Sequence, residues 1–275
     1  TAPSGQTTPT KVTLPPITLL ARAGSAIALA EVQEAERKTV LRYYPTGDLT
    51  ATSQQFTVDG AAAGSIALDD TRAAVFTFHG VTVIDLATGN QRVVADSNLI
   101  IPQQMTFSGD DLLVMDARQL LVYDDARTLI RDHALPTQPI AFDAAPTFAA
   151  IATVSGVAAV RYLADGPLPS TPFTSSFYTK LASASDRVYL FDQDRIDVLS
   201  TAVPSKPGFI TTIPASGTVD MTATDTALFT LTGNGAVTAY SRAGVVTAQA
   251  SISDGFDSQI LGIHTAGNAV WASLA

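Results

Sequence analysis

The stretch TRAAVFTFHGVTVIDLATGNQRVV, from Thr71 to Val94, decides the fold. It opens with an apolar run, Ala73 to Phe78, which His79-Gly80 interrupts before a second run, Val81 to Leu86. Runs of five or six apolar residues bounded by glycine or aspartate are too short for typical helices and suit buried strands. Gly89-Asn90 then closes a turn, because both residues tolerate positive φ. The stretch therefore predicts consecutive antiparallel strands joined by tight turns.

The same arrangement returns along the chain about every 40 residues. Each repeat contains a turn of aspartate, glycine or proline, and an apolar run follows that turn. The residues that mark these turns are Gly24, Asp70, Asp111, Pro146, Asp186, Asp225 and Gly267. Seven turns at this spacing, with up to four short strands in each repeat, are typical of a propeller. We therefore predict an all-β, seven-bladed β-propeller.

The run VTVIDLATGNQRVV resembles the YVTN-type repeats of extracytoplasmic propellers, and it is similar to the repeats of quinoprotein-like propellers. The resemblance covers one blade well and the other six loosely. It implies the fold and an extracytoplasmic location, that is, a secreted, periplasmic or surface protein. The Gly-His and Trp-Asp pairs of WD-repeat proteins are missing, as is the tryptophan that typically marks quinoprotein blades.

The composition limits the partners that the chain can have. Of its 275 residues, 46% are hydrophobic and 15% are charged, and the formal net charge is −9. An acidic surface repels phosphate backbones and anionic headgroups, so we expect no nucleic-acid partner and no docking on anionic membranes. The chain has no cysteine, which excludes disulfides and thiolate chemistry. No apolar run approaches the ~20 residues that a membrane-spanning helix needs.

The two ends of the chain complete the expected domain organisation. Thr1 to Thr10 is small and polar, and we expect a flexible tether there. Residues 11–275 are expected to form one propeller domain, because blades bury their faces only against neighbouring blades. The last repeat has only two strands, Gln259 to Thr265 and Ala269 to Leu274. We expect the unassigned segment Lys11 to Leu14 to pair with them and close the last blade.

Propellers place their binding sites where loops collect around the axial channel. We expect the turns between the second and third strands, together with the connections between blades, to form that face. Polar and charged side chains on these segments are Glu34, Glu36, Arg37, His79, Asp116, Arg118, Asp192, Asp194, Arg195, Asp254 and Asp257. The first three belong to EVQEAERK, for which we expect a long charged loop.

The sequence predicts no catalytic residue, no metal and no cofactor. Asp192, Asp194 and Asp197 could offer oxygens to Ca²⁺, but the glycine and bidentate glutamate of an EF-hand are missing. Arg195 lies among them and would offset their charge. The three histidines are expected in a turn, an outer strand and an inner strand, too far apart to share a metal: His79, His133 and His264.

Three functions are compatible with this pattern. The first is a non-enzymatic binding or scaffold module for protein or glycan partners. The second is a propeller enzyme of the lactonase or quinoprotein kind, and the third is a structural spacer of a larger surface protein. The first strands of the repeats offer mainly small and hydroxyl residues rather than the charged or metal-binding cluster that an enzyme needs; examples are GSIAL, QMTFS, LASAS, VDMTAT and ILGIHT. Binding is therefore the favoured function.

Overall fold

The computed structural model describes residues 19–23, 25–94, 104–124, 128–135, 137–145, 148–154, 156–160, 178–184, 186–202, 208–251, 260–266 and 269–274. These residues form 25 β-strands and one short 3₁₀ helix. The strands make seven antiparallel sheets. The prediction of an all-β chain is confirmed. Within these ranges, no helix has the length and apolar character needed to cross a membrane.

The strands fall into two compact units. The N-terminal unit holds three four-stranded sheets: β1 (Leu19–Ala23), β2 (Ala26–Gln33), β3 (Lys38–Tyr44) and β4 (Gln54–Asp59); β5 (Ala62–Leu68), β6 (Arg72–Thr77), β7 (Gly80–Asp85) and β8 (Gln91–Val94); β9 (Gln104–Ser108), β10 (Asp111–Met115), β11 (Gln119–Tyr123) and β12 (Leu129–Ala134).

The C-terminal unit holds the other four sheets, of three, four, four and two strands. They are β13 (Pro139–Ala145), β14 (Phe148–Thr153) and β15 (Gly156–Val160); β16 (Lys180–Ala184), β17 (Arg187–Asp192), β18 (Arg195–Ser200) and β19 (Gly208–Pro214); β20 (Thr218–Ala223), β21 (Ala227–Thr232), β22 (Ala236–Ser241) and β23 (Val246–Ser251); β24 (Ile260–Ala266) and β25 (Ala269–Leu274). The two-stranded last sheet agrees with the sequence prediction.

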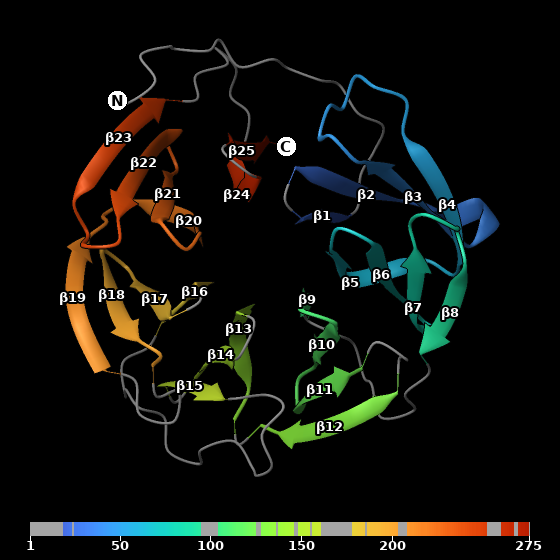
Figure 1. Cartoon of the computed structure of the whole chain (residues 1–275), viewed down its shortest axis with the longest axis horizontal. Helices are drawn as coiled ribbons and strands as arrows, with labels where there is room; N and C mark the ends of the chain where they lie inside the picture. The colour runs from blue at the N-terminus through green and yellow to red at the C-terminus, as the bar shows by residue number, and fades with distance from the viewer. Residues whose placement is uncertain are drawn as a thin grey trace. The chain divides into compact units, whose positions relative to one another are not determined.

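Each sheet is a meander in which neighbours along the chain are hydrogen-bonded (Figure 1). We call the first strand of a sheet its inner strand and the fourth its outer strand. Within each unit the sheets follow one another in chain order, and the inner strand of one sheet contacts the inner strand of the next. The inner strands of the N-terminal unit are therefore neighbours in the order β1, β5, β9.

Each pair of neighbouring sheets encloses its own apolar core. Successive residues of a strand point to opposite faces, so the two faces of β6 contribute to different cores. Ala73 and Val75 pack with the sheet β1–β4, whereas Ala74 and Phe76 pack with the sheet β9–β12. All residues of β6 are buried. This burial on both faces explains why the second strands read as continuous apolar runs in the sequence.

The turns are built as their residue types predict. Asp85 Oδ1 accepts hydrogen bonds from the backbone N–H groups of Ala87 (3.1 Å) and Thr88 (2.8 Å). Gly89 follows at φ +73°. The next strand is held to the preceding sheet, because Gln91 Nε2 donates to the Thr57 carbonyl at 2.9 Å. The third-to-fourth-strand turn of one sheet therefore rests on the outer strand of the sheet before it.

The expectation of a long charged loop over EVQEAERK is wrong. Strands β2 and β3 pair as far as Gln33 and Lys38, and only the 3₁₀ helix η1 (Glu34–Glu36) and Arg37 connect them. An ion pair of 3.0 Å between Arg42 and Glu31, across the two strands, helps to keep this part of the hairpin extended. Arg37 closes the turn in the left-handed conformation, at φ 53°. The charged residues therefore stand on a tight turn.

Several predictions concern residues outside the described ranges. These are the tether at Thr1 to Thr10, the closing strand at Lys11 to Leu14, and the candidate residues Asp254 and Asp257. The organisation of residues 11–275 as one propeller domain also stays a prediction.

Candidate binding site

The turns between second and third strands are fastened by backbone hydrogen bonds to the segment that follows the outer strand of the same sheet. The bonded pairs are Gly60 N–H with the Arg37 carbonyl (2.8 Å), Leu135 N–H with the Arg118 carbonyl (2.7 Å) and Ala215 N–H with the Asp194 carbonyl (2.7 Å). Only the backbone of the turn residue takes part. The side chains of the three turn residues are exposed. The turns are therefore held in place while their side chains are available to a partner.

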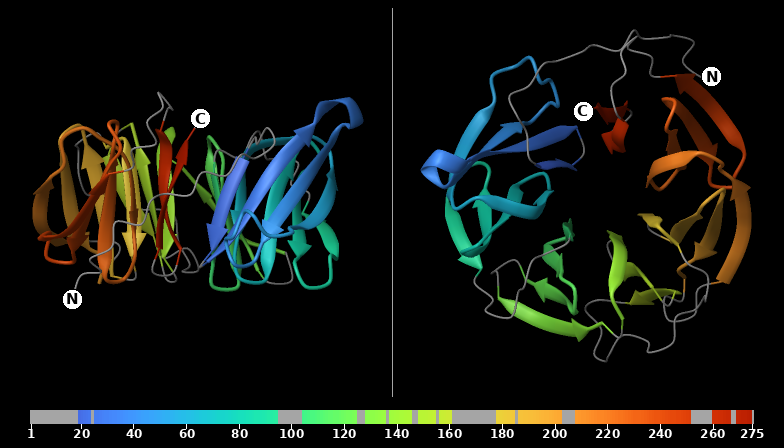
Figure 2. Two further views of the ribbon diagram at one scale, coloured as in Figure 1. Left: turned by 90° about the horizontal axis from the view of Figure 1, so that it is seen from above. Right: turned by 180° about the vertical axis from the view of Figure 1, so that it is seen from behind.

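The structure brings two of the predicted turns of the N-terminal unit against one connection. Gly60 lies between β4 and β5, and its amide is bonded to Arg37 in the β2–β3 turn. A Cβ added at Gly60 would lie 2.9 Å from Thr77 Cβ and 3.2 Å from His79 Cδ2, at the β6–β7 turn. The β2–β3 hairpin, in blue in the left panel of Figure 2, stands out at the edge of the unit. Arg37 and His79 therefore belong to one surface.

An exposed aromatic residue, Phe78, stands beside His79 in the β6–β7 turn. Its side chain is 79% exposed. The sequence analysis missed it, because Phe78 reads as the last residue of a buried apolar run. Strand β6 instead ends at the buried Thr77, whose hydroxyl accepts a hydrogen bond from the His79 N–H at 3.2 Å. This local bond turns the backbone one residue early and leaves Phe78 outside the core.

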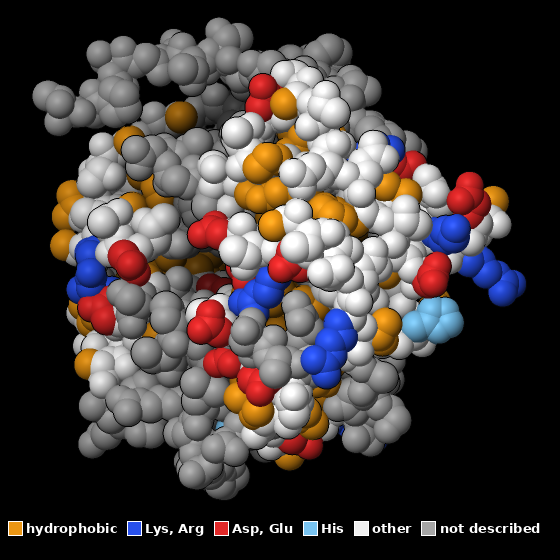
Figure 3. Space-filling model, turned by 45° about the vertical axis from the view of Figure 1, so that its right-hand side comes forward, with side chains coloured by type: hydrophobic (Ala, Val, Ile, Leu, Met, Phe, Trp, Pro, Cys, Tyr) orange, Lys and Arg blue, Asp and Glu red, His pale blue; other side chains and the backbone are white. Residues whose placement is uncertain are grey.

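We define the turn surface as Glu34, Glu36, Arg37, Phe78, His79 and Arg118. These residues come from the β2–β3, β6–β7 and β10–β11 turns, which face the same side of the N-terminal unit because its three sheets share one strand order. All six are exposed. Figure 3 shows acidic and basic side chains interspersed over the face that it draws, with hydrophobic atoms between them. Such a mixed surface suits recognition of a protein better than recognition of a polyanion.

Asp116, also predicted for this surface, is fully buried. Its Oδ1 accepts hydrogen bonds from the backbone N–H groups of Arg118 (2.7 Å) and Gln119 (2.9 Å). The Asp116 carboxylate therefore stabilises the turn that carries the exposed Arg118, and it is not itself exposed to a partner.

The predicted residues of the C-terminal unit form an ion-pair group. Arg195 lies 3.9 Å from an Asp192 oxygen and 3.7 Å from an Asp197 oxygen, so it offsets both charges. Asp197 is buried and accepts hydrogen bonds from Tyr178 (2.7 Å) and Thr212 (2.6 Å). In the part of the chain that the structure describes, no group of three or more histidine, aspartate or glutamate residues is arranged to hold a metal ion.

Carboxylates on the inner strands are a feature that the sequence analysis did not single out. Asp143 Oδ2 accepts the Ser183 N–H at 2.6 Å, and Asp220 Oδ2 accepts the Ile263 N–H at 2.9 Å. Each bond runs from one inner strand to the next, between residues about 40 positions apart. Ser65 makes the same connection in the N-terminal unit, where its hydroxyl accepts the Met105 N–H at 3.2 Å.

These side chains satisfy backbone donors that an edge strand leaves open. The sequence did contain a signal for these carboxylates, namely an aspartate inside a strand, as in PIAFDAA and TVDMTA. Aspartate is disfavoured in strands, so its presence there indicates a specific role. Asp220 also lies 3.4 Å from Lys180 Nζ. The inner strands of the C-terminal unit therefore carry more charge than the small and hydroxyl residues that the sequence analysis emphasised.

No protein-family model matches the chain, and no curated protein matches it in sequence. Hsv2 from Kluyveromyces marxianus is similar in structure, with a TM-score of 0.67 and 10% identity over 94% of this chain and 89% of that one. A chain of the Mitotic Checkpoint Complex gives 0.67 and 12%, over 94% and 86%.

A third solved structure is PorZ from Porphyromonas gingivalis, described as a bacterial surface component of the type-IX secretion system. It gives a TM-score of 0.61 and 13% identity, over 93% of this chain and 35% of that one. All three are β-propellers. The fold is that of a β-propeller. The sheets of both units are therefore propeller blades, and the bonds between inner strands join one blade to the next.

The carboxyl group of Asp143 is expected to make the free energy of unfolding depend on pH. Burial raises its pKa to about 6, although the backbone N–H groups of Ser183 and Ala144 act in the opposite direction. The unfolded value is about 3.9, so the folded state binds the proton more tightly. This contribution to stability is complete below pH ~4 and is lost as the pH rises through ~6. Keeping Asp143 ionised in the folded state therefore costs about 3 kcal/mol at neutral pH.

We expect Asp143→Asn to remove this pH dependence. As the pH rises from 4 to 7, the variant should become more stable relative to the native protein, by about 2 kcal/mol in the free energy of unfolding. Urea unfolding at four pH values measures the difference. Asp194→Asn, at an exposed position, is the control and should follow the native curve. Parallel curves for native protein and Asp143→Asn would contradict the prediction.

Proposed function

We propose that this protein is a non-enzymatic β-propeller that binds a protein partner through the turn surface of its N-terminal unit. The observation that carries the proposal is the exposure of Phe78 at the tip of a turn, among charged side chains. The side chains of Glu34, Glu36, Arg37 and Arg118 make no hydrogen bond or ion pair with other described residues, so their charges are available. Aromatic and arginine residues are the types most enriched among those that dominate binding energy.

The energetics of this surface favour a specific complex. Burying the exposed phenylalanine against a partner would supply about 1.5 to 3 kcal/mol. The glutamate and arginine side chains around it would select a partner with complementary charges and speed the encounter. Because backbone hydrogen bonds already fix the turns at Arg37 and Arg118, little backbone entropy would be lost on binding.

The replacement Phe78→Ala tests the proposal. We expect recovery of the partner from an extract of the native host to fall at least ~10-fold, which corresponds to about 1.4 kcal/mol. Val245→Ala is the matched control, because Val245 is 63% exposed in a turn of the C-terminal unit. Quantitative mass spectrometry of the captured proteins compares the three baits. A partner that is retained equally by all three would show that the turn surface does not bind it.

We also propose that the chain forms a seven-bladed ring whose last blade is closed by residues 11–14, with residues 1–10 as a tether. The seven sheets support this, as does the two-stranded sheet β24–β25. Deleting residues 1–15 should lower the melting temperature by several degrees, and deleting residues 1–9 should leave it nearly unchanged. Equal melting temperatures for the two truncations would mean that the ring is closed in another way.

An extracytoplasmic location is part of the same proposal. It is supported by the resemblance of VTVIDLATGNQRVV to YVTN-type repeats and by the likeness to PorZ, a surface component. Fractionation of the native host tests it, and recovery of the protein with cytoplasmic markers would contradict it.

A second candidate function, a propeller enzyme, is favoured by Asp143 alone. A carboxyl group whose pKa lies near neutrality can act as a general acid or base. Both of its oxygens, however, already accept backbone hydrogen bonds. Lactone hydrolysis that disappears in the folded Asp143→Asn variant would establish the enzyme instead of the binding module.

A further inference from the structure

The outer strand β23 is exposed along its whole length. In four other sheets, one residue of the outer strand is at most 5% exposed, and it is always the residue paired with the second residue of the third strand. These buried residues are Val58, Val94, His133 and Ile213. The residue at the same register in β23 is Ala250, which pairs with Val237 and is exposed, as are the other residues of the strand. Strand β23 therefore lacks the burial that the other outer strands have.

The exposure of β23 follows from the sheet that comes after it. In both units, the turn between the third and fourth strands of one sheet covers the outer strand of the sheet before. Gln91 holds the β7–β8 turn on β4, and a Cβ added at Gly244 in the β22–β23 turn would lie 3.0 Å from Ile213 Cγ1 in β19. The sheet after β23 has two strands in the described part of the chain, β24 and β25, and so no such turn. The closing strand proposed above at residues 11–14 would add none.

Strand β23 also lacks the features that usually keep a free sheet edge from pairing. An outer strand is a template for pairing with another chain, and proteins block it with charged residues or proline. Each of the other four outer strands contains such a residue, namely Asp59, Arg92, Asp132 or Pro214. Strand β23 reads VTAQAS, and the run from Ala243 to Ser251 holds no charged residue and no proline. Its edge is therefore open to a further strand.

The charge of the chain favours a second copy of this protein as the occupant of that edge. The formal net charge is −9, so two copies repel each other wherever acidic side chains meet. Residues 243–251 carry no charge, so two copies can approach here without opposing like charges. A different protein is usually selected by complementary charges, and β23 offers none. Two-fold symmetric dimers are also the commonest oligomers.

We propose that two copies of this protein dimerise by antiparallel pairing of β23 with β23. Side chains directly opposite each other lie on the same face of a sheet, so two-fold symmetry centres the pairing on one residue. The register centred on Ala248 places Thr247 opposite Gln249 and Val246 opposite Ala250. It joins two four-stranded sheets into one continuous sheet across the dimer. The contact lies in the C-terminal unit and does not involve the turn surface.

Sedimentation velocity over a wide range of concentrations tests for the dimer. Because the six residues of β23 make a small interface, association should be weak, and the dimer fraction should rise with concentration. Ala248→Lys places like charges opposite each other and should raise the dissociation constant at least ~10-fold. Gln55→Lys is the matched control, because Gln55 is an exposed residue of the outer strand β4, and it should leave the constant unchanged.

Two further measurements separate loss of the dimer from loss of the fold. Mixing Ala248→Lys with Ala248→Glu should restore dimerisation, because opposite charges then face each other, and each variant in dilute solution should melt within about 2 °C of the native protein. Amide hydrogen exchange of residues 246–251 in the native protein should slow as its concentration rises. Sedimentation as a monomer at every concentration would overturn the proposal, as would a dimer that Ala248→Lys does not weaken or that leaves the amides of β23 unprotected.

Discussion

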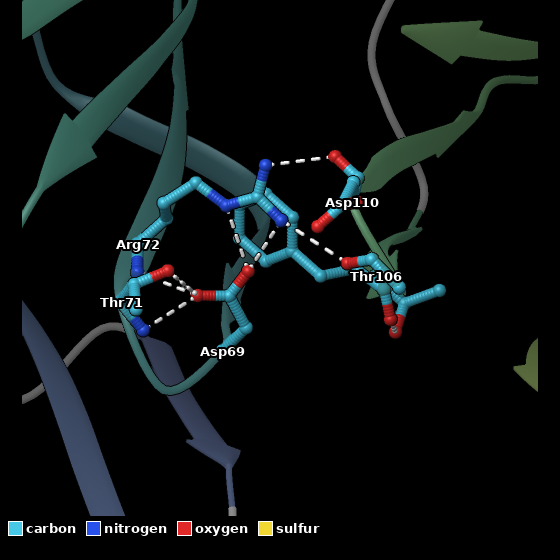
Figure 4. A network of polar contacts seen from close by, with 7 residues as sticks. Asp69, Thr71, Arg72, Thr106 and Asp110 are labelled. Atoms are coloured by element: carbon cyan, nitrogen blue, oxygen red, sulfur yellow. Dashed lines mark hydrogen bonds and ion pairs between the residues drawn. The ribbon is translucent and has the colours of Figure 1, made fainter. Parts of the chain in front are cut away.

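Replacing Arg72 by alanine is expected to lower the free energy of unfolding by about 3 to 5 kcal/mol. Arg72 is 8% exposed and joins two blades of the N-terminal unit (Figure 4). Its guanidinium donates to Asp69 Oδ2 within its own blade and to the carbonyls of Asp110 (2.7 Å) and Gly109 (3.1 Å) in the next. It also lies 4.6 Å from the ring centre of Phe107. The alanine variant would leave the Asp69 carboxylate and two carbonyls without these donors.

Denaturant unfolding measures this loss, and two variants calibrate it. Arg118→Ala removes an arginine from an exposed turn of the same unit and should change stability by less than about 0.5 kcal/mol. Arg72→Lys keeps the charge but not the planar fork of donors, so it should recover only part of the loss. A cost of less than about 1 kcal/mol for Arg72→Ala would show that the blades are not held together by this network.

The second large effect is expected from Gly60→Ala, at about 2 to 5 kcal/mol of lost stability. Gly60 has φ +94°, a conformation in which a side chain is strained. The new methyl group would lie 2.9 Å from Thr77 Cβ, so the β6–β7 turn would have to move. Gly60 also carries the amide bonded to Arg37, and its carbonyl accepts from Thr39 Oγ1 at 2.8 Å. The backbone strain at residue 60 and the displacement of the β6–β7 turn therefore both disturb the connection between β4 and β5.

Gly217→Ala separates the two contributions. Gly217 has φ +76°, and nothing lies within 4 Å of the added methyl group, so only the backbone strain of about 1 to 2 kcal/mol should appear. The excess loss in Gly60→Ala then measures the packing of the β6–β7 turn on the connection. Equal losses in the two variants would mean that this turn moves aside without cost, and the turn surface would not be rigid.

The sequence predicted the second strands and the turns, because these elements are determined by residues close together in the chain. The second strands were visible because burial on both faces makes them continuously apolar, and the turns were visible because aspartate and glycine have fixed roles in them. Phe78 was assigned to a strand because hydrophobicity does not show that the Thr77 hydroxyl accepts a hydrogen bond from the His79 amide and that the strand ends at Thr77. The apolar run does extend to Phe78, but the strand ends one residue earlier, at Thr77.

The candidate site was less predictable, because its geometry depends on distant pairs. Asp143 meets Ser183, and Asp220 meets Ile263, across a whole blade, and no local pattern contains both partners. Asp116 looked like a charged loop residue, but its carboxylate is used by two backbone amides nearby. The exposed charges at Glu34, Glu36, Arg37 and Arg118 could be proposed from sequence because tight turns usually carry polar residues.

The attachment of the turns at Arg37, Arg118 and Asp194 through their carbonyls has a consequence for how this protein can change. A carbonyl is present whatever the side chain, so Arg118 and Asp194 can be replaced by many residue types without loss of the bond, whereas Arg37, at φ 53°, favours glycine or asparagine as its replacement. Natural drift at Arg118 can alter what the turn surface recognises at little cost in folding. The same freedom makes Arg118 and Asp194 suitable positions to randomise in a library that selects for new ligands on an unchanged scaffold.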